Sequence, residues 1–315
     1  SKFKRKPYVY LNKRVIKETN NSKIYLAFQC MKNDKKEVVI KYVPVRGKNK
    51  QIDLEIEIQN SLHNKYLMPL IDDFEIPKKY RVLIMEYGLG TLISGYDKTS
   101  HFFKSMQQLY KIMFQIAKGV DYLHTKKVLH GDIKPSNVLI MNDNNYMPFV
   151  QIIDFGYSVC LPEYDGTDDT CCKCHNLTPE YSAPEVLRSR PHSFPSDIWS
   201  LGATFYYVIT QQYIFREKYR SCQELAEELE FGLDLPFNTP NGQIFPQTGK
   251  DMIYSMLNPV PNLRPTSKDI INSDFFKEVL DDQWLAEEAA FSKLEMQEET
   301  VDDIVKASTD KSDVM

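Results

Sequence analysis

The sequence has no long apolar run and no excess of charge of one sign. It contains no uninterrupted apolar stretch of about 18 residues, the length at which a membrane-spanning helix becomes a candidate, so we expect no membrane contact. Lys and Arg number 39 and Asp and Glu number 43, and this net charge of −4 gives no global reason to expect nucleic-acid binding. The N-terminal segment is polar and basic and lacks the apolar centre of a secretory signal.

Cysteine is scarce and badly placed for a disulfide framework. Three of the six cysteines, Cys171, Cys172 and Cys174, fall within four positions. This layout favours a reducing compartment, so we expect the protein in the cytoplasm or the nucleus. Three interpretations of the cluster stay open: reduced thiols, a redox-sensitive loop, or a Zn²⁺ site in which Cys171, Cys174 and His175 are ligands.

The composition, with 42% hydrophobic and 26% charged residues, is that of an ordinary globular protein. The first ~95 residues contain β-rich runs at 38–43 and 81–85. Between them, residues 52–58 alternate with period two, but charges and the break at 63–64 leave a helix equally open. After residue 100 the apolar residues follow helical spacing. These helical patterns lie at 109–123, 198–209, 252–257 and 267–280.

The distribution predicts an α+β, two-lobed architecture with a cleft. The expected parts are an N-terminal lobe at 1–87, a helical lobe at 88–280, a C-terminal helix at 281–299 and an acidic, disordered tail at 300–315.

Residues 130–137, His-Gly-Asp-Ile-Lys-Pro-Ser-Asn, carry the strongest chemical signal. They resemble the H-R-D-L-x-x-x-N catalytic loop of protein kinases, with Gly131 in place of Arg. Phosphoryl transfer requires groups that hold the phosphates, hold Mg²⁺ and orient the acceptor hydroxyl. The resemblance implies that Asp132 orients the hydroxyl, Lys134 neutralises the γ-phosphate and Asn137 holds Mg²⁺. A lysine at position 134 is similar to serine/threonine kinases.

Three further segments resemble the same family in the same order. Residues 38–41, Val-Val-Ile-Lys, resemble the strand with the phosphate-binding lysine, and Ile152-Ile153-Asp154-Phe155-Gly156 resembles the D-F-G segment, 22 residues after Asp132. Residues 178–185, Thr-Pro-Glu-Tyr-Ser-Ala-Pro-Glu, resemble the end of a kinase activation segment. The resemblance covers roughly residues 8–280 and implies the two-lobed protein kinase fold.

The resemblance also assigns the nucleotide-binding residues. Lys41 would contact the α and β phosphates and pair with a helix glutamate, Glu55 first and Glu57 second, while Asp154 would hold Mg²⁺. Met85 would be the gatekeeper behind the adenine. The remaining assigned residues are the hinge residues Glu86, Tyr87 and Gly88 and the cleft residues Ile16, Ile24 and Leu139.

Three assignments implied by the family concern the fold. Thr178 would contact the catalytic Asp and Lys, and Asp197 would brace the backbone of the catalytic loop. Glu185 would form a buried ion pair with Arg264.

The sequence departs from the family at three places. Lys17, Thr19 and Ser22 stand where the three lid glycines fall, so we expect altered ATP affinity, with Lys17 or Lys23 adding charge. Gly131 removes the arginine that pairs with activation-loop phosphate, which predicts activity independent of that phosphate. Gln59 replaces an apolar helix residue and needs a polar partner.

The leading hypothesis is a serine/threonine protein kinase that uses ATP and Mg²⁺ on a protein substrate, with a regulatory partner allowed. The alternative is a pseudokinase that acts as a scaffold, which the absent glycines favour. His-Gly-Asp also resembles aminoglycoside and choline phosphotransferases, but those families lack the segment at 178–185.

Overall fold

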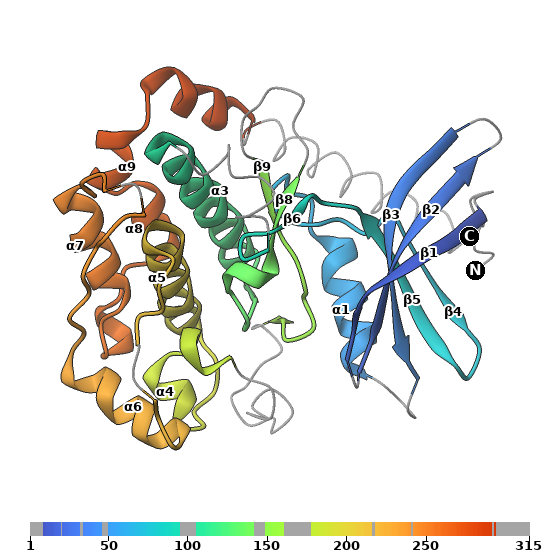
Figure 1. Cartoon of the computed structure of the whole chain (residues 1–315), viewed down its shortest axis with the longest axis horizontal. Helices are drawn as coiled ribbons and strands as arrows, with labels where there is room; N and C mark the ends of the chain where they lie inside the picture. The colour runs from blue at the N-terminus through green and yellow to red at the C-terminus, as the bar shows by residue number, and fades with distance from the viewer. Residues whose placement is uncertain are drawn as a thin grey trace, which may run out of the picture.

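A computed structural model describes residues 9–19, 21–31, 34–45, 50–94, 105–141, 149–160, 178–215, 218–240, 242–291 and 293. Within these residues a β-sheet with one helix forms the N-terminal lobe, and a larger, mostly helical lobe follows (Figure 1). The protein therefore has the two-lobed arrangement that the sequence predicts. None of the described helices is both long and apolar enough to span a membrane.

The N-terminal sheet is antiparallel and has the order β1-β2-β3-β5-β4. Its strands are β1 (Val9–Glu18), β2 (Lys23–Met31), β3 (Asp34–Pro44), β4 (Asp72–Ile76) and β5 (Tyr80–Glu86). On one face Ala27, Val38 and Ile40 form a small core with Val82 and Ile84. On the other face Leu83 packs against the helix α1 (Lys50–Ser61).

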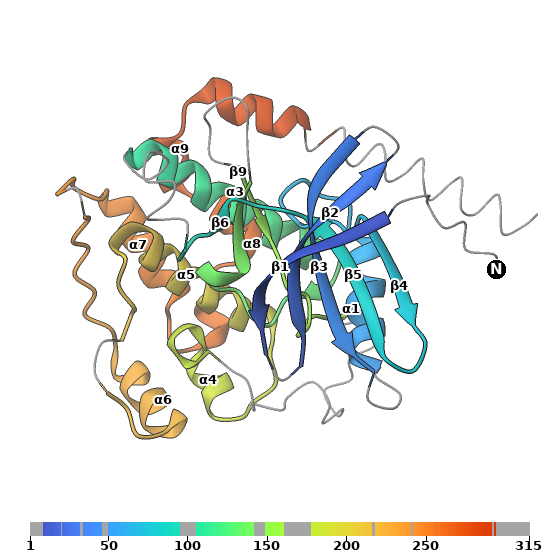
Figure 2. The same ribbon diagram turned by 45° about the vertical axis from the view of Figure 1, so that its right-hand side comes forward.

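Residues 52–58, for which the sequence left strand and helix open, are helical and belong to α1. Ile52 and Ile56 pack on the sheet with Leu83, whereas Ile58 belongs to the core of the helical lobe. The helix is thus covered on two sides. This double burial places apolar residues at spacings that mimic a strand. Figure 2 shows α1 beside the N-terminal sheet.

The helical lobe is built around α3 (Met106–Thr125) and α5 (Phe194–Thr210). Helix α5 begins at Ser193, whose side chain forms a capping box with Ser196, and it is apolar nearly all round because other helices cover it. The other helices of this lobe are α4 (Pro184–Leu187), α6 (Cys222–Phe231), α7 (Gln247–Met256), α8 (Ser267–Ile271) and α9 (Asp274–Val279), with short 3₁₀ turns η1 (Pro135–Asn137), η5 (Pro179–Tyr181) and η6 (Pro261–Leu263).

The apolar pattern at 267–280 is two helices, α8 and α9, rather than one. The interruption lies at Asn272, which ends α8, and Ser273, whose hydroxyl accepts a hydrogen bond from the Phe276 N–H and so caps α9. Residues 282–291 then form a further helix, while residues 300–315, for which we expected disorder, lie outside the described residues.

Two small sheets carry residues 130–137 and the segment that contains Asp154. Strand β8 (Val138–Met141) lies between β6 (Gly90–Thr91) and β9 (Phe149–Ile152), and β7 (Val128–Leu129) pairs with β10 (Val159–Cys160). The loop from β7 to β8 contains residues 130–137, and the loop after β9 contains Asp154. Both polar segments therefore follow buried strands, and β8 and β9 lie between the helices of the larger lobe and the N-terminal sheet (Figure 1).

Candidate active site

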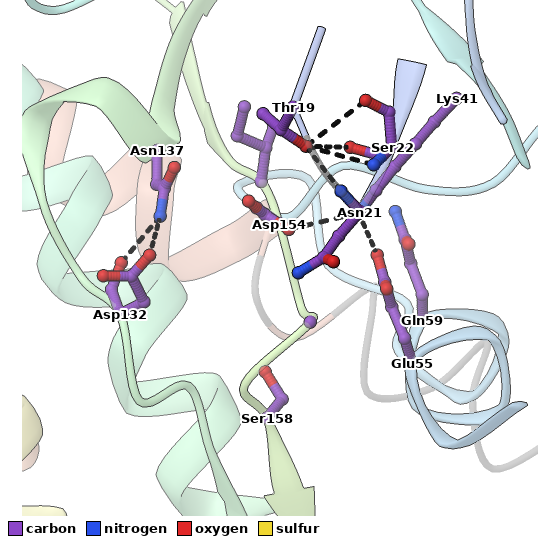
Figure 3. A network of polar contacts seen from close by, with 12 residues as sticks. Thr19, Asn21, Ser22, Lys41, Glu55, Gln59, Asp132, Asn137, Asp154 and Ser158 are labelled. Atoms are coloured by element: carbon purple, nitrogen blue, oxygen red, sulfur yellow. Dashed lines mark hydrogen bonds and ion pairs between the residues drawn. The ribbon is translucent and has the colours of Figure 1, made fainter. Parts of the chain in front are cut away.

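Lys41 lies at the centre of a three-residue charge network. Its Nζ is 2.6 Å from Glu55 Oε1 on α1 and 3.2 Å from Asp154 Oδ1 after β9 (Figure 3). Glu55 is buried, whereas Glu57, the second candidate, is exposed. Three segments that are distant in the sequence thus meet at one ammonium group.

Burial and charge act in opposite directions on this network. Burial by itself would lower the pKa of Lys41, but the carboxylates of Asp154 and Glu55 outweigh it and raise that pKa. Burial would raise the pKa of Asp154, but Lys41 foremost, with His130 and Lys17, lowers it. Lys41 and Asp154 are therefore held in their charged forms, as groups that bind phosphate and a divalent cation must be.

The catalytic-loop residues form a second network around Asp132. Asn137 Nδ2 donates to the Asp132 backbone oxygen at 2.9 Å and to its Oδ2 at 2.8 Å (Figure 3). Lys134 Nζ lies 2.7 Å from the same Oδ2. Lys134 also donates to Thr178 Oγ1 at 2.6 Å, which ties the loop to the segment at 178–185. Burial raises the pKa of Asp132, and the Lys134 charge opposes that increase.

Asp197 on α5 braces the backbone of this loop. Its Oδ2 accepts from the His130 N–H at 2.9 Å, and its Oδ1 accepts from the Gly131 N–H at 3.0 Å. His124, at the end of α3, donates to the same carboxylate at 3.1 Å, a contact that the sequence analysis missed because nothing in the motif pattern marks this histidine. Burial would raise the pKa of Asp197, but the bond from His124 lowers it.

Gly131 occupies a backbone conformation with φ of +78°. A Cβ at this position would lie 2.9 Å from the carbonyl oxygen of Tyr157. Glycine at position 131 therefore matters apart from the missing arginine side chain. A residue with a Cβ would be strained in this left-handed conformation and would lie too close to the Tyr157 backbone.

Asp154 also has a positive φ, +69°, although it is not glycine. The next residue, Phe155, is fully buried, and its ring lies 5.4 Å from the ring of His130. Burial of Phe155 and the ion pair with Lys41 therefore hold Asp154 in a conformation that an aspartate seldom adopts elsewhere.

The proposed adenine-binding side is formed where β5 leaves the N-terminal lobe. Met85 and Glu86 are opposite Val39 and Val38 of β3, and Lys36 forms an ion pair with Glu86. Tyr87 and Gly88 follow, and a Cβ at Gly88 would lie 3.0 Å from the Ile140 oxygen and 3.3 Å from Leu139. This close packing brings the hinge against β8.

Ile24, on β2, lies directly opposite Lys41 in the sheet. Ile16 lies at a β-bulge between Val15 and Lys17 and is exposed. These two residues and Leu139 thus come from both lobes.

Glu185 and Arg264, which the family resemblance pairs, form an ion pair in the larger lobe. Arg264 forms a two-pronged ion pair with Glu185, with Nη1–Oε1 and Nη2–Oε2 distances of 2.6 and 2.8 Å. The guanidinium also lies over the ring of Trp199. Both charges are buried and paired, so this contact fixes the segment at 178–185 against α5.

Gln59 has a polar partner. Its Nε2 donates to the backbone oxygen of Met68 at 2.7 Å, and the side chain is buried. The sequence suggested that a partner was needed but could not identify it, because a backbone carbonyl leaves no signal in the residue pattern.

The residues of the possible Zn²⁺ site, Cys171, Cys174 and His175, lie outside the described residues. Within the part of the chain that the structure describes, no group of three or more His, Cys, Asp or Glu side chains is arranged to hold a metal ion.

The sequence profile of the protein kinase domain matches residues 12–276. A striated muscle preferentially expressed protein kinase of Danio rerio is 31% identical over 272 residues, 85% of this chain and 8% of that protein. The serine/threonine-protein kinase par-4 of Caenorhabditis briggsae is 29% identical over 229 residues, 71% of this chain and 33% of par-4. An Aurora kinase of Schizosaccharomyces pombe is 28% identical over 222 residues, 70% of this chain and 58% of that kinase. The chain spans less than two thirds of each of these relatives.

Proposed function

This chain belongs to the protein kinase family, and on that premise we propose that it is an active serine/threonine protein kinase that transfers the γ-phosphate of ATP to protein hydroxyls. The observation that carries the proposal is the joint presence of two networks. Lys41 of β3 and Glu55 of α1 meet Asp154 after β9, and Asp132, Lys134 and Asn137 are joined within the loop between β7 and β8. A non-catalytic protein has no chemical need for both networks.

The donor atoms fit ATP and Mg²⁺. Asp154 offers an ionised carboxylate, and the bond from Asn137 Nδ2 to Asp132 leaves the amide oxygen of Asn137 as its ligand atom. Hard oxygen donors of this kind suit Mg²⁺, which, when bound, neutralises charge that develops on the transferring phosphoryl group. Lys41 and Lys134 would bind phosphate oxygens on either side of this position.

Asp132 would accept a hydrogen bond from the attacking hydroxyl and take up its proton as the bond to phosphorus forms. The Lys134 ammonium and the Asn137 amide both contact the Asp132 carboxylate, so this carboxylate is oriented before the substrate binds. The link from Lys134 to Thr178 supports an assignment to serine/threonine substrates, as does the family resemblance at position 134.

We further propose that activity does not require phosphate on the activation loop. Asp197 holds the catalytic loop through backbone N–H groups, and Gly131 offers no side chain to receive a phosphate. The geometry around Asp132 is thus supported by contacts within the described protein. A protein substrate, a regulatory partner and residence in the cytoplasm or nucleus belong to the same proposal.

The direct test is transfer of labelled γ-phosphate from ATP with Mg²⁺ to a general protein substrate, with wild type compared with Asp132→Asn. We expect phosphoserine and phosphothreonine from the wild type and a loss of about 10²–10⁴-fold in the variant, the usual range for removal of a catalytic acid or base. Equal labelling by both proteins would exclude the enzyme.

The pseudokinase alternative is favoured by one observation, the absence of glycine at positions 17, 19 and 22. A pseudokinase could still bind nucleotide. If MgATP raises the melting temperature of the wild type and no γ-phosphate is transferred, the scaffold interpretation replaces the enzyme.

A further inference from the structure

Lys17 lies in a row of side chains that crosses the N-terminal sheet. The strand register pairs Lys17 on β1 with Ile24 on β2, and Ile24 with Lys41 on β3. Side chains directly opposite each other on neighbouring strands project from the same face of a sheet. Lys17 and Lys41 therefore leave the same face, two strands or about 10 Å apart.

This face is the one that looks onto the candidate active site. Lys41 reaches Glu55 and Asp154 from it, and its neighbour Leu83 packs under α1. Lys17 leaves this face through its pairing with Ile24, and Lys41, on the same face, is ion-paired with the Asp154 carboxylate. Two lysines thus bring positive charge to one side of Asp154.

In the β1–β2 turn, by contrast, the N–H groups of the described residues Thr19, Asn21 and Ser22 already donate hydrogen bonds within the turn. Thr19 Oγ1 accepts from the N–H groups of Asn21 and Ser22 at 3.3 and 3.0 Å (Figure 3). The Thr19 N–H donates to the Ser22 carbonyl oxygen at 2.9 Å. In a glycine-rich turn, N–H groups like these would be available to phosphate oxygens.

We propose that the Lys17 side chain, together with Lys41, binds the ATP phosphates in place of the backbone amides of the β1–β2 turn. The proposal rests on the proposed kinase function and names the group that replaces the glycine lid. Phosphate recognition at this edge of the sheet then depends on the attraction between lysine ammonium groups and phosphate oxygens. Because Lys17 is exposed, salt weakens its share of this attraction.

The structure also separates Lys17 from the other lysine of the hairpin. Lys23 is opposite Tyr42, one position along the strand from Ile24, so it projects from the other face of the sheet. There it forms an ion pair with Glu18 at 3.1 Å and lies over the ring of Tyr25. Lys23 is therefore a matched control on the same hairpin.

The test is calorimetric titration of the full chain with MgATP and with adenosine, for wild type, Lys17→Met and Lys23→Met. We expect Lys17→Met to weaken MgATP binding about tenfold, the loss expected for one hydrogen bond to a charged group, and to flatten its salt dependence. Adenosine carries no phosphate, so its affinity stays the same in all three proteins, as does MgATP affinity in Lys23→Met.

Thr19 provides a second, independent arm. Thr19→Gly releases the N–H groups of Asn21 and Ser22, so in the Lys17→Met background it restores part of the MgATP affinity. Thr19→Ser keeps the acceptor oxygen and restores none.

The outcomes test the role of Lys17 separately from the proposed kinase function. Equal MgATP affinity in wild type and Lys17→Met, with adenosine bound by both, would overturn the role of Lys17 and leave the kinase proposal intact. If the wild type binds neither MgATP nor adenosine, both proposals fail.

Discussion

At the scale of single residues, the two aspartates of the site differ in the balance between burial and neighbouring charge. For Asp154 the charge of Lys41 prevails over burial and the pKa falls, which suits a permanent cation ligand. For Asp132 burial prevails over Lys134 and the pKa rises, which suits a group that takes up a proton. The same residue type therefore serves two roles.

This difference predicts the pH dependence of activity. Asp132 must be unprotonated to accept the hydroxyl proton, so kcat/KM falls as the pH drops through its pKa, which lies above the ordinary value of 3.8. Because Lys134 lowers that pKa, Lys134→Gln should move the acid limb to higher pH as well as reduce the rate. A pH profile of both proteins checks this, and an acid limb that stays in place or moves to lower pH contradicts it.

Gly131 allows a prediction about stability. Gly131→Ala places a Cβ 2.9 Å from the Tyr157 oxygen in a left-handed conformation, whereas Gly242 has a similar φ of +67° with nothing within 4 Å of its Cβ. Left-handed strain costs about 1–2 kcal/mol for a residue with a Cβ, and only position 131 adds the steric clash. Urea unfolding should therefore show a larger loss for Gly131→Ala than for Gly242→Ala. Equal losses would show that the contact with Tyr157 is unimportant.

The motif residues were proposed from the sequence because residues 130–137 resemble a known family motif. Asn137 lies five residues after Asp132 in that motif, and in the structure its amide bonds to that aspartate at 2.8 Å. The partners of Gln59 and His124 could not be predicted in this way. One contacts a backbone carbonyl and the other a carboxylate 73 residues away, and neither contact constrains the local sequence.

At the scale of elements, α1 is the part whose position determines whether Glu55 reaches Lys41. Gln59, one turn after Glu55, bonds the carbonyl of Met68 and so joins α1 to the segment at 64–68. That segment runs beside the end of β9, where the Met68 N–H donates to the Ile152 oxygen at 2.9 Å and the Ile152 N–H donates to the Tyr66 oxygen at 2.8 Å. One short stretch therefore supports both Glu55 and the strand that leads to Asp154.

Removal of the Gln59 bond should loosen this support. Gln59→Met preserves the length of the side chain but cannot donate to Met68, so we expect a loss of about 1–3 kcal/mol in the free energy of unfolding and faster amide exchange in α1. Asn60→Ala is the control, because Asn60 is exposed and bonds only a surface aspartate among the described contacts. Equal losses of unfolding free energy in the two variants would show that the bond from Gln59 to Met68 does not stabilise α1.

The type of α1 could not be decided from the sequence for a physical reason. A helix covered on one side shows a clear period of 3.6, but α1 contacts the sheet through Ile52 and Ile56 and the larger lobe through Ile58. Helix α3 is buried on most of its surface too, but its apolar residues keep a helical spacing, and its bounds were predicted nearly correctly. The break between α8 and α9 was missed because capping by Ser273 interrupts the backbone without interrupting the apolar pattern.

At the scale of the whole molecule, the helix at 282–291 packs against both α3 and the segment at 64–68. It is the red helix at the top of Figure 1. Trp284 packs on Phe114 of α3, and Glu288 accepts a hydrogen bond from Tyr66 and lies 3.1 Å from Lys65 Nζ. The helix thus binds the same segment at 64–68 that Gln59 holds from the other side.

This contact predicts that the C-terminal helix stabilises the kinase fold. Glu288→Gln removes the charge from a largely buried ion pair, so we expect a loss of about 1–3 kcal/mol, seen as a lower melting temperature. Glu287→Gln is the matched control, because that side chain is exposed and bonds Gln283 within the helix. A drop of equal size in both variants would contradict a specific role for Glu288. The limits of this helix and of the two lobes along the chain remain predictions.

The central claim is that this chain assembles a working phosphoryl-transfer site without phosphate on its activation loop. The measurement is the initial rate of γ-phosphate transfer by fully dephosphorylated protein, its state verified by mass spectrometry, with Asp132→Asn in parallel. The account predicts a constant rate from the first seconds in the wild type and a loss of about 10²–10⁴-fold in the variant. A lag that ends only as the protein phosphorylates itself, or equal transfer by both proteins, would contradict it.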